Sequence, residues 1–270
     1  RCHDFGLSYS VSNYDCRNAF PSTSSDAMKA HHEKHVKFTD QPFATQKRKG
    51  TSIHVDTGDT KFPMLIREGD VQGHTTAAKD FVSIYTPRVE SWVEYLEKRN
   101  NTYGWTKTTD PISHKEVDIG TITFVDDVTK LHIHDFHPNC EKVVEQLNLA
   151  TESLDGILSE TKHALNQSKT NHLVSVRGRG SHDVCREIHA ASSIHGAVVR
   201  ELRVLGPLLD VDLGNRASIS NRLEAANLAW IRLGPIWSNA PIKMIRMLFS
   251  GFIVGTLVSG LNPFILGRHE

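Results

Sequence analysis

The chain has 270 residues, with 31 Lys and Arg residues balanced by 31 Asp and Glu residues. This length is sufficient for one large domain or two modest ones with a hydrophobic core, and the zero net charge excludes a strongly basic surface over the whole chain. The four cysteines form no CxxC pair, which favours a reducing, intracellular setting over a disulfide framework.

The two ends of the sequence indicate whether it belongs to a longer polypeptide and whether it could enter a membrane. The first residue is Arg1, with neither an initiator Met nor an apolar signal-peptide region after it, so we expect a piece of a longer polypeptide. Residues 247–267 carry no charge and are long enough to span a bilayer. Because polar residues interrupt this run, we expect a buried helix and no membrane contact, with a membrane span as the minor alternative.

The first part of the chain predicts a strand and two helices. Alternating apolar residues predict a strand over 7–15, and a Ser/Thr-rich turn then leads into a helix. The polar, basic stretch 44–62 suits a hairpin or a loop. Residues 74–99 have a long helical pattern, in which Pro87 is expected to kink or divide the helix.

The rest of the chain predicts strands first and helices last. A loop is expected over 100–118, strands over 119–125 and 128–134, and a helix over 138–165, where apolar residues recur at helical spacing. Further strands are expected over 173–176 and 200–212, and helices over 216–237 and 241–261. This order predicts an α+β fold, in which a layer of sheet and helices precedes a helical subdomain.

Asp126 and Asp127 lie between the two strands predicted at 119–134. A tight hairpin turn usually contains Gly or Asn, because its central residues need a positive φ, so Val-Asp-Asp-Val is an unusual turn sequence. Two adjacent carboxylates repel each other, and a divalent cation such as Mg²⁺ would remove that repulsion. Taken alone, the pair is better interpreted as a solvated acidic turn than as a metal site.

Five short motifs in order give the acidic pair a context. They are Asp15-Cys-Arg-Asn-Ala-Phe20, Arg67-Glu-Gly-Asp70, Phe124-Val-Asp-Asp127, Leu165-Asn-Gln-Ser-Lys-Thr170 and Val204-Leu-Gly206. In this order they resemble the palm motifs of reverse transcriptases, specifically those of non-LTR (LINE-like) retrotransposons. The resemblance covers nearly the whole chain. It implies a polymerase palm, an antiparallel sheet with helices packed on one face, over 1–212, and a thumb-like helical region over 213–270.

The resemblance implies an RNA-directed DNA polymerase, a nucleotidyltransferase that uses an RNA template, a DNA primer and deoxynucleoside triphosphates. Asp15, Asp126 and Asp127 would then be the catalytic, metal-binding residues, and they would hold two Mg²⁺ ions, for which Mn²⁺ is the alternative. Such an enzyme would act in the nucleus or the cytoplasm. The motifs carry no information on oligomeric state.

The resemblance also assigns substrate contacts. Phe20 would lie beneath the incoming sugar and reject a 2′-hydroxyl, and Lys169 would lie near the triphosphate. Arg67 and Gly69 belong to the segment that binds template and nucleotide, where Gly69 lets the pair approach the backbone. A strand formed by Val204, Leu205 and Gly206 would contact the primer.

The sequence departs from the family pattern at several points. Glu68 stands where the family has Gln, and Val204 where it has Tyr. The chain begins shortly before Asp15, so we expect the fingers to be largely missing. The alternative function is therefore a catalytically inactive retroelement remnant that only folds or binds nucleic acid.

The histidines after the acidic pair form a weaker pattern. His132, His134, His137 and Cys140 do not match a common zinc-binding spacing. We therefore expect solvated histidines on a strand face and in a loop, with a zinc site as the less favoured alternative.

Overall fold

The computed structural model describes residues 6–17, 19, 23–42, 52–56, 58, 60–65, 77–99, 106–134, 138–211 and 216–258. By internal contacts the chain divides into two compact units, Arg1–His172 with Val176–Val198, and Val199–Glu270 with Leu173–Ser175. The fold is α+β, as the sequence predicts, with a largely antiparallel sheet followed by helices.

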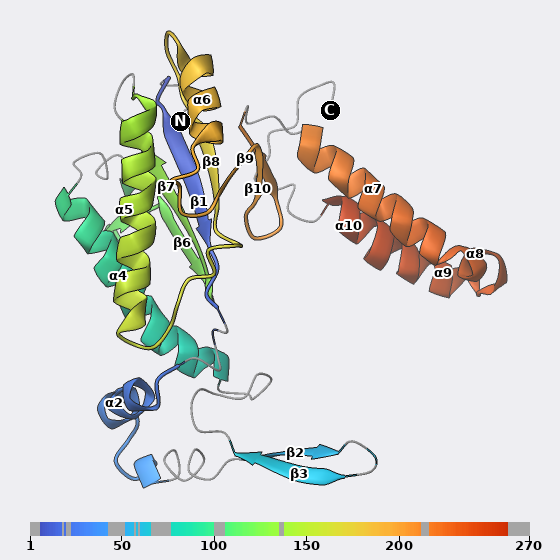
Figure 1. Cartoon of the computed structure of the whole chain (residues 1–270). Helices are drawn as coiled ribbons and strands as arrows, with labels where there is room; N and C mark the ends of the chain where they lie inside the picture. The colour runs from blue at the N-terminus through green and yellow to red at the C-terminus, as the bar shows by residue number, and fades with distance from the viewer. Residues whose placement is uncertain are drawn as a thin grey trace. The chain divides into compact units, whose positions relative to one another are not determined.

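The largest sheet in the described residues has five strands, in the order β6-β7-β1-β8-β9 (Figure 1). Its strands are β1 (Tyr9–Tyr14), β6 (Thr121–Phe124), β7 (Asp127–Ile133), β8 (Asn171–Ser175) and β9 (Ala197–Val199). Strand β7 pairs antiparallel with both β1 and β6, and the β1 register joins Tyr9 to Ile133 and Tyr14 to Val128. The strands predicted over 7–15, 119–125, 128–134 and 173–176 are thus confirmed.

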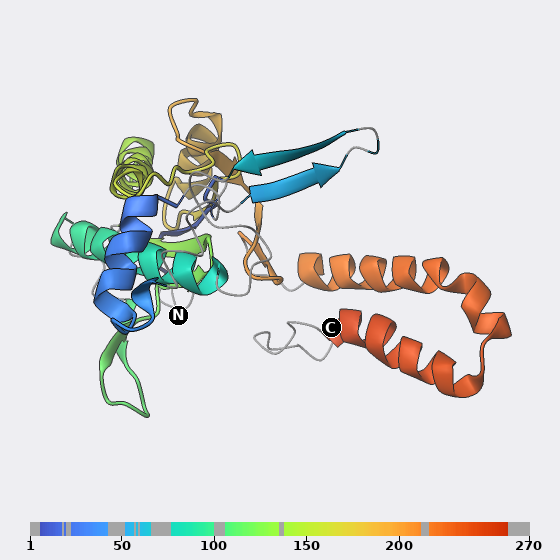
Figure 2. The ribbon, with the colours of Figure 1, turned by 90° about the horizontal axis from the view of Figure 1, so that it is seen from below.

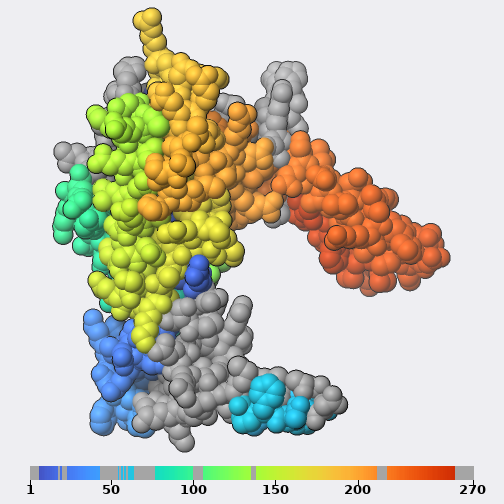
Figure 3. Space-filling view, viewed as in Figure 1, coloured from blue at the N-terminus to red at the C-terminus, as the bar shows by residue number. Residues whose placement is uncertain are grey.

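The helices of the first part of the chain are α2 (Ser25–His35), α4 (Ala77–Arg99), α5 (Cys140–Ser159) and α6 (Ser181–Ala190). In α5 the buried residues recur at helical spacing, from Val143 to Leu158, because that face packs against the core. Asn139 caps this helix, and its side chain accepts a hydrogen bond from the Lys142 N–H. In the space-filling view α5 and α6 form a continuous surface (Figure 3).

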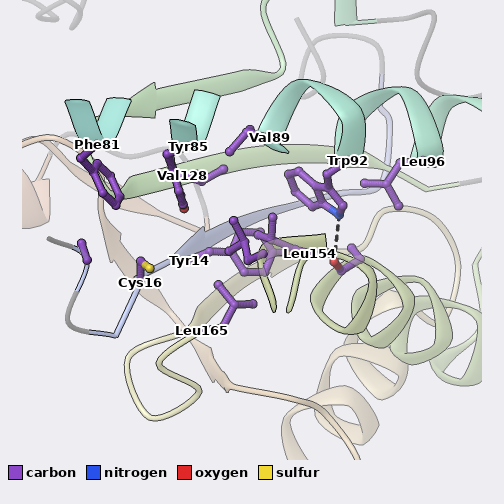
Figure 4. Close-up of a cluster of buried hydrophobic side chains, with 13 residues drawn as sticks. Tyr14, Cys16, Phe81, Tyr85, Val89, Trp92, Leu96, Val128, Leu154 and Leu165 are labelled. Atoms are coloured by element: carbon purple, nitrogen blue, oxygen red, sulfur yellow. Dashed lines mark hydrogen bonds between the residues drawn. The ribbon is translucent and has the colours of Figure 1, made fainter. Parts of the chain in front are cut away.

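Trp92 of α4 joins three elements of the core. Its fully buried ring packs edge-on against Tyr14 of β1, with 5.5 Å between ring centroids. Its indole Nε1–H donates to the Ala150 carbonyl of α5 at 3.0 Å (Figure 4). Phe81, Tyr85, Val89 and Leu96 of α4 belong to the same cluster, so the sheet and the two helices share one core.

One expectation for this region is wrong, and for two others the structure decides between the alternatives. Pro87 does not divide α4, since residues on both sides of it, Tyr85 and Val89, are buried in the core and hold the helix together. The stretch 100–118 is not a simple loop but contains a hairpin of β4 (Lys107–Thr109) and β5 (Glu116–Asp118). Strands β2 (Ser52–Asp56) and β3 (Lys61–Leu65) form a second hairpin, one of the two structures expected for 44–62.

His132 of β7 and His134, which directly follows that strand, are buried rather than solvated, which corrects the expectation for both residues. Both lie on the same side of the sheet as Ser10 and Ser12, and they are 0% and 4% exposed. His134 shares hydrogen bonds with Ser10 (3.0 Å) and with Gln146 of α5 (2.6 Å). The strand carries polar residues on its buried face, which the helices cover. His137 lies outside the described residues.

The second unit contains a hairpin and a helical hairpin. The β-hairpin consists of β10 (Glu201–Arg203) and β11 (Leu208–Asp210). Helix α7 (Arg216–Arg232) then runs alongside α9 (Ile242–Leu248), η2 (Phe249–Val254) and α10 (Gly255–Val258), with α8 (Gly234–Asn239) between them (Figure 2). Within residues 216–258, the described part of this region, no helix is long and apolar enough to cross a membrane.

Candidate active site

The turn between β6 and β7 carries the acidic pair. Phe124 faces Asp127 across the hairpin, so Val125 and Asp126 are its two central residues. Val125 has a φ of 56°, a left-handed conformation that β-branched residues rarely adopt. Such strain persists only where the surroundings hold it in place, and it concentrates at functional sites.

Two contacts hold this turn. Val125 packs against the hydrophobic core, and the Tyr85 hydroxyl of α4 donates to the Asp126 backbone carbonyl at 3.3 Å. The turn is therefore anchored to the longest helix of the structure. The role of the Tyr85 hydroxyl has no signal in the sequence, because the helical pattern shows only that this residue faces the core.

Asp15 lies next to this hairpin. Tyr14 pairs with Val128 in the antiparallel ladder, so the residues one step further, Asp15 and Asp127, come opposite each other. The Asp15 carbonyl accepts a hydrogen bond from the Asn166 N–H at 2.8 Å, which ties the end of β1 to the segment after α5. Asp15 and Asp127, which are far apart in the sequence, thus lie opposite each other.

Lys169 completes the group. The turn that follows Asn166 is closed by a hydrogen bond from the Lys169 N–H to the Asn166 carbonyl at 2.9 Å. The Lys169 Nζ then lies 3.3 Å from Asp15 Oδ2, with the lysine side chain 66% exposed and the aspartate side chain 20% exposed. We refer to Asp15, Asp126, Asp127 and Lys169 as the carboxylate–lysine cluster.

The carboxylates of this cluster influence one another electrostatically. Burial raises the pKa of Asp127, the negative charges of Asp126 and Asp15 raise it further, and the Lys169 ammonium lowers it. Burial raises the pKa of the nearby Cys16 thiol to about 12, with Asp126 and Asp15 adding to that shift. The region is thus a concentration of negative charge, and among the described residues Lys169 is the cation that offsets it at Asp127.

Carboxylate oxygens are the donors that Mg²⁺ prefers, and Asp15 already attracts one cation, the Lys169 ammonium, so the chemistry of the cluster fits a divalent ion. Within the described part of the chain, no three His, Cys, Asp or Glu side chains are gathered closely enough to hold a metal ion. The arrangement of the carboxylates is that of an ion pair with lysine and not that of a coordination shell.

Other predicted site residues fall elsewhere. Phe20, Arg67 and Gly69 lie outside the described residues. Val204, Leu205 and Gly206 belong to the second unit, whereas the carboxylate–lysine cluster belongs to the first.

The expectation that Val204, Leu205 and Gly206 form a strand is wrong. They lie in the turn between β10 and β11, where the Val204 N–H donates to the Pro207 carbonyl at 2.9 Å. Leu205 and Gly206 have φ values of 47° and 110°, and two successive positive φ angles are typical of a type I′ hairpin turn. Pro207 has no N–H to extend the ladder, which helps to end the strand at Arg203.

A groove of about 460 Å³ lies beside this turn, within the second unit. Leu205 and Gly206 form part of its wall, and its polar lining is Arg203, Ser218, Asn221, Arg222 and Thr256. The lining includes two guanidinium groups and no carboxylate, a composition that suits an anion.

Comparison with known proteins supports the fold alone. No family model and no curated protein matches the sequence. Among solved structures, the chain is similar to apo telomerase from Candida tropicalis lacking its C-terminal domain, with a TM-score of 0.50 and 10% identity over 77% of this chain. The chain therefore has a reverse-transcriptase-like fold.

The similarity extends over only part of that protein, because the chain covers 35% of the telomerase chain. Telomerases from Candida tropicalis and Candida albicans, each in complex with a fragment of telomeric RNA, match with TM-scores of 0.46 and 0.41 at 11% and 12% identity. These matches span 95% of this chain and 39% of theirs.

Proposed function

We propose that this chain is the palm and thumb portion of the reverse transcriptase of a non-LTR retrotransposon. It transfers a nucleotide from a deoxynucleoside triphosphate to the 3′-hydroxyl of a DNA primer on an RNA template. The observation that carries the proposal is the strand register that sets Asp15 opposite the Asp126–Asp127 hairpin in a reverse-transcriptase-like fold.

The carboxylates have defined roles in this proposal. Asp15 and Asp126 would hold two Mg²⁺ or Mn²⁺ ions, and Asp127 would support the site from the base of the same hairpin. Such ions would activate the primer hydroxyl and neutralise charge on the leaving pyrophosphate. The Tyr85 hydroxyl keeps the Asp126 backbone in place, so Asp126 presents its carboxylate in a fixed position.

The remaining residues position the substrates. Lys169 carries a positive charge to the triphosphate, and Phe20 lies beneath the incoming sugar. Arg67 and Gly69 contact the template–nucleotide pair, and the turn of Val204, Leu205 and Gly206 contacts the primer end. The groove beside that turn, with Arg203 and Arg222, offers charge to the backbone of the nucleic acid.

Primer extension tests the proposal. The whole chain is assayed with poly(rA)/oligo(dT), dTTP and Mg²⁺, and Asp126→Asn is expected to lower incorporation by about 100-fold, since loss of one metal-ligating carboxylate costs roughly 3 kcal/mol of transition-state stabilisation. The control is Asp183→Asn, which removes an exposed carboxylate on α6 and should leave incorporation unchanged.

Two results would count against an active polymerase. Equal incorporation by the original chain and Asp126→Asn would contradict the catalytic assignment. No incorporation by either, from chains that melt cooperatively, would favour the folded remnant.

A further inference from the structure

The Asp15–Lys169 pair carries an inference about how the site admits its metal ions. The Lys169 ammonium and a divalent cation need the same carboxylate, because Asp15 Oδ2 is the atom that the ammonium contacts at 3.3 Å. We propose that Lys169 is a built-in counter-ion that a divalent cation must displace from Asp15, and that this displacement releases Lys169 to bind the triphosphate. This inference rests on the proposed polymerase function.

The surroundings of Asp15 explain why it retains a counter-ion. Asp126 and Asp127 place two more negative charges at the neighbouring hairpin. The Asp155 carboxylate, which accepts a hydrogen bond from the Leu165 N–H at 2.8 Å, acts electrostatically on Cys16, the residue after Asp15. Three acids on adjacent strand ends repel one another unless a cation lies among them. The lysine relieves part of that repulsion.

The backbone of Lys169 is held while its side chain is free to move. The Thr170 N–H donates to the Asn166 carbonyl at 3.0 Å, and the Asn171 side-chain amide donates to the Lys169 carbonyl at 2.9 Å. The Lys169 side chain, by contrast, is 66% exposed. Its long stem can therefore swing to another anion without any rearrangement of the turn.

The strength of the pair suits an exchange. An exposed ion pair between flexible side chains shifts the equilibrium between its broken and formed states by no more than about fivefold. A divalent cation attracts a carboxylate about twice as strongly as a monovalent ammonium at the same distance, and Asp126 and Asp127 add to its binding. The ammonium therefore weakens cation binding without preventing it.

The exchange predicts opposite effects on two ligands when the charge of Lys169 is removed. Mn²⁺ should bind Lys169→Gln about fivefold more tightly than the original chain, because its competitor is gone. The KM for dTTP should rise in the same variant, because the triphosphate has lost a cation. A lysine that merely supported the structure would weaken both ligands together.

The test is a Mn²⁺ titration of the whole chain, followed by the electron paramagnetic resonance signal of the free ion, with no nucleotide present. Lys169→Arg keeps the charge and should bind Mn²⁺ as the original chain does. Lys29→Gln is the matched control, because Lys29 also forms an exposed ion pair, with Glu33 at 3.9 Å on α2. Asp126→Asn should bind Mn²⁺ weakly.

The outcomes separate this inference from the function on which it rests. If Asp126→Asn loses Mn²⁺ while Lys169→Gln binds it as tightly as the original chain does, the exchange is refuted and the metal site stands. If neither the original chain nor Lys169→Gln binds Mn²⁺, the proposed metal site fails, and the exchange fails with it. Tighter binding by Lys169→Gln and by no other variant supports the exchange.

Discussion

Acidification is expected to destabilise the first unit through its buried histidines. His132, His163 and His172 are 0%, 1% and 0% exposed. Each shares hydrogen bonds with buried neutral groups. His163 contacts the hydroxyls of Thr23 (3.2 Å) and Thr161 (2.8 Å), and His172 contacts the Ser12 hydroxyl at 2.8 Å. A protonated ring in these positions would be a buried charge with no carboxylate among these partners.

The sign of the effect follows from the pKa shifts. Burial lowers the pKa of His163 to about 4, and burial, with the charge of neighbouring groups, lowers the pKa of His132 and of His172. An imidazole in the unfolded chain has a pKa near 6.5, so below that pH the unfolded chain binds protons that the folded chain does not. Stability is therefore intact above pH 7 and falls as the pH drops through 6.5.

The magnitude is large for a protein domain. For His163, lowering the pH from 7.5 to 5.5 costs about 1.4 kcal/mol of unfolding free energy. If the other two rings also stay neutral when folded, the total reaches about 4 kcal/mol, a large part of the roughly 5–15 kcal/mol that stabilises a typical domain. Burial raises the pKa of Asp118, but hydrogen bonds and the Lys130 charge outweigh that effect and lower the pKa to about 2, so Asp118 loses its contribution to stability only at much lower pH.

Urea denaturation at pH 7.5, 6.5 and 5.5, followed by far-UV circular dichroism, measures this slope. His163→Asn keeps hydrogen-bonding capacity without a titratable ring, so its stability should fall less steeply with pH, by about 1.4 kcal/mol over the range. His114→Asn is the control, since His114 is exposed and its φ of 54° is one that Asn tolerates. A stability that changes by less than about 1 kcal/mol between pH 7.5 and 5.5, or equal slopes for His163→Asn and the original chain, would refute the reasoning.

Two further changes test the core and the groove. Trp92→Phe removes the hydrogen bond to the Ala150 carbonyl and leaves a void in the core. This change should lower the unfolding free energy, measured in urea, by about 2 kcal/mol. The control Trp230→Phe should have a smaller effect, because Trp230 is 46% exposed. Equal losses would show that Trp92 is not a packing centre. Arg222→Gln should weaken primer–template binding and reduce its salt dependence by about one counter-ion, whereas Arg232→Gln, outside the groove lining, should not. An unchanged salt slope for Arg222→Gln would remove the groove from the nucleic-acid surface.

Local patterns in the sequence were sufficient for many of the elements. The apolar repeat from Val143 to Leu158 predicted α5, and alternation predicted β1, β6 and β7. The same reasoning missed α6, whose 10 residues are mostly polar, and the β4–β5 hairpin, whose strands have three residues each. Strands of three residues are too short for an alternation to show, whereas Val184 and Ile188 of α6 do recur at helical spacing, so the signal for that helix was present in the sequence.

The sequence by itself determined which residues could form the candidate site, because an acidic pair between two strands and an Asp at the end of a third are local features. Only the tertiary structure decided how they meet. The register of β1 on β7 set Asp15 opposite Asp127, and the turn at Asn166 brought Lys169 to Asp15. It also decided that His132 is buried, because a strand shows two faces and only the packing of helices determines which of them is covered. Pairing across more than a hundred residues depends on long-range packing, which no local spacing records.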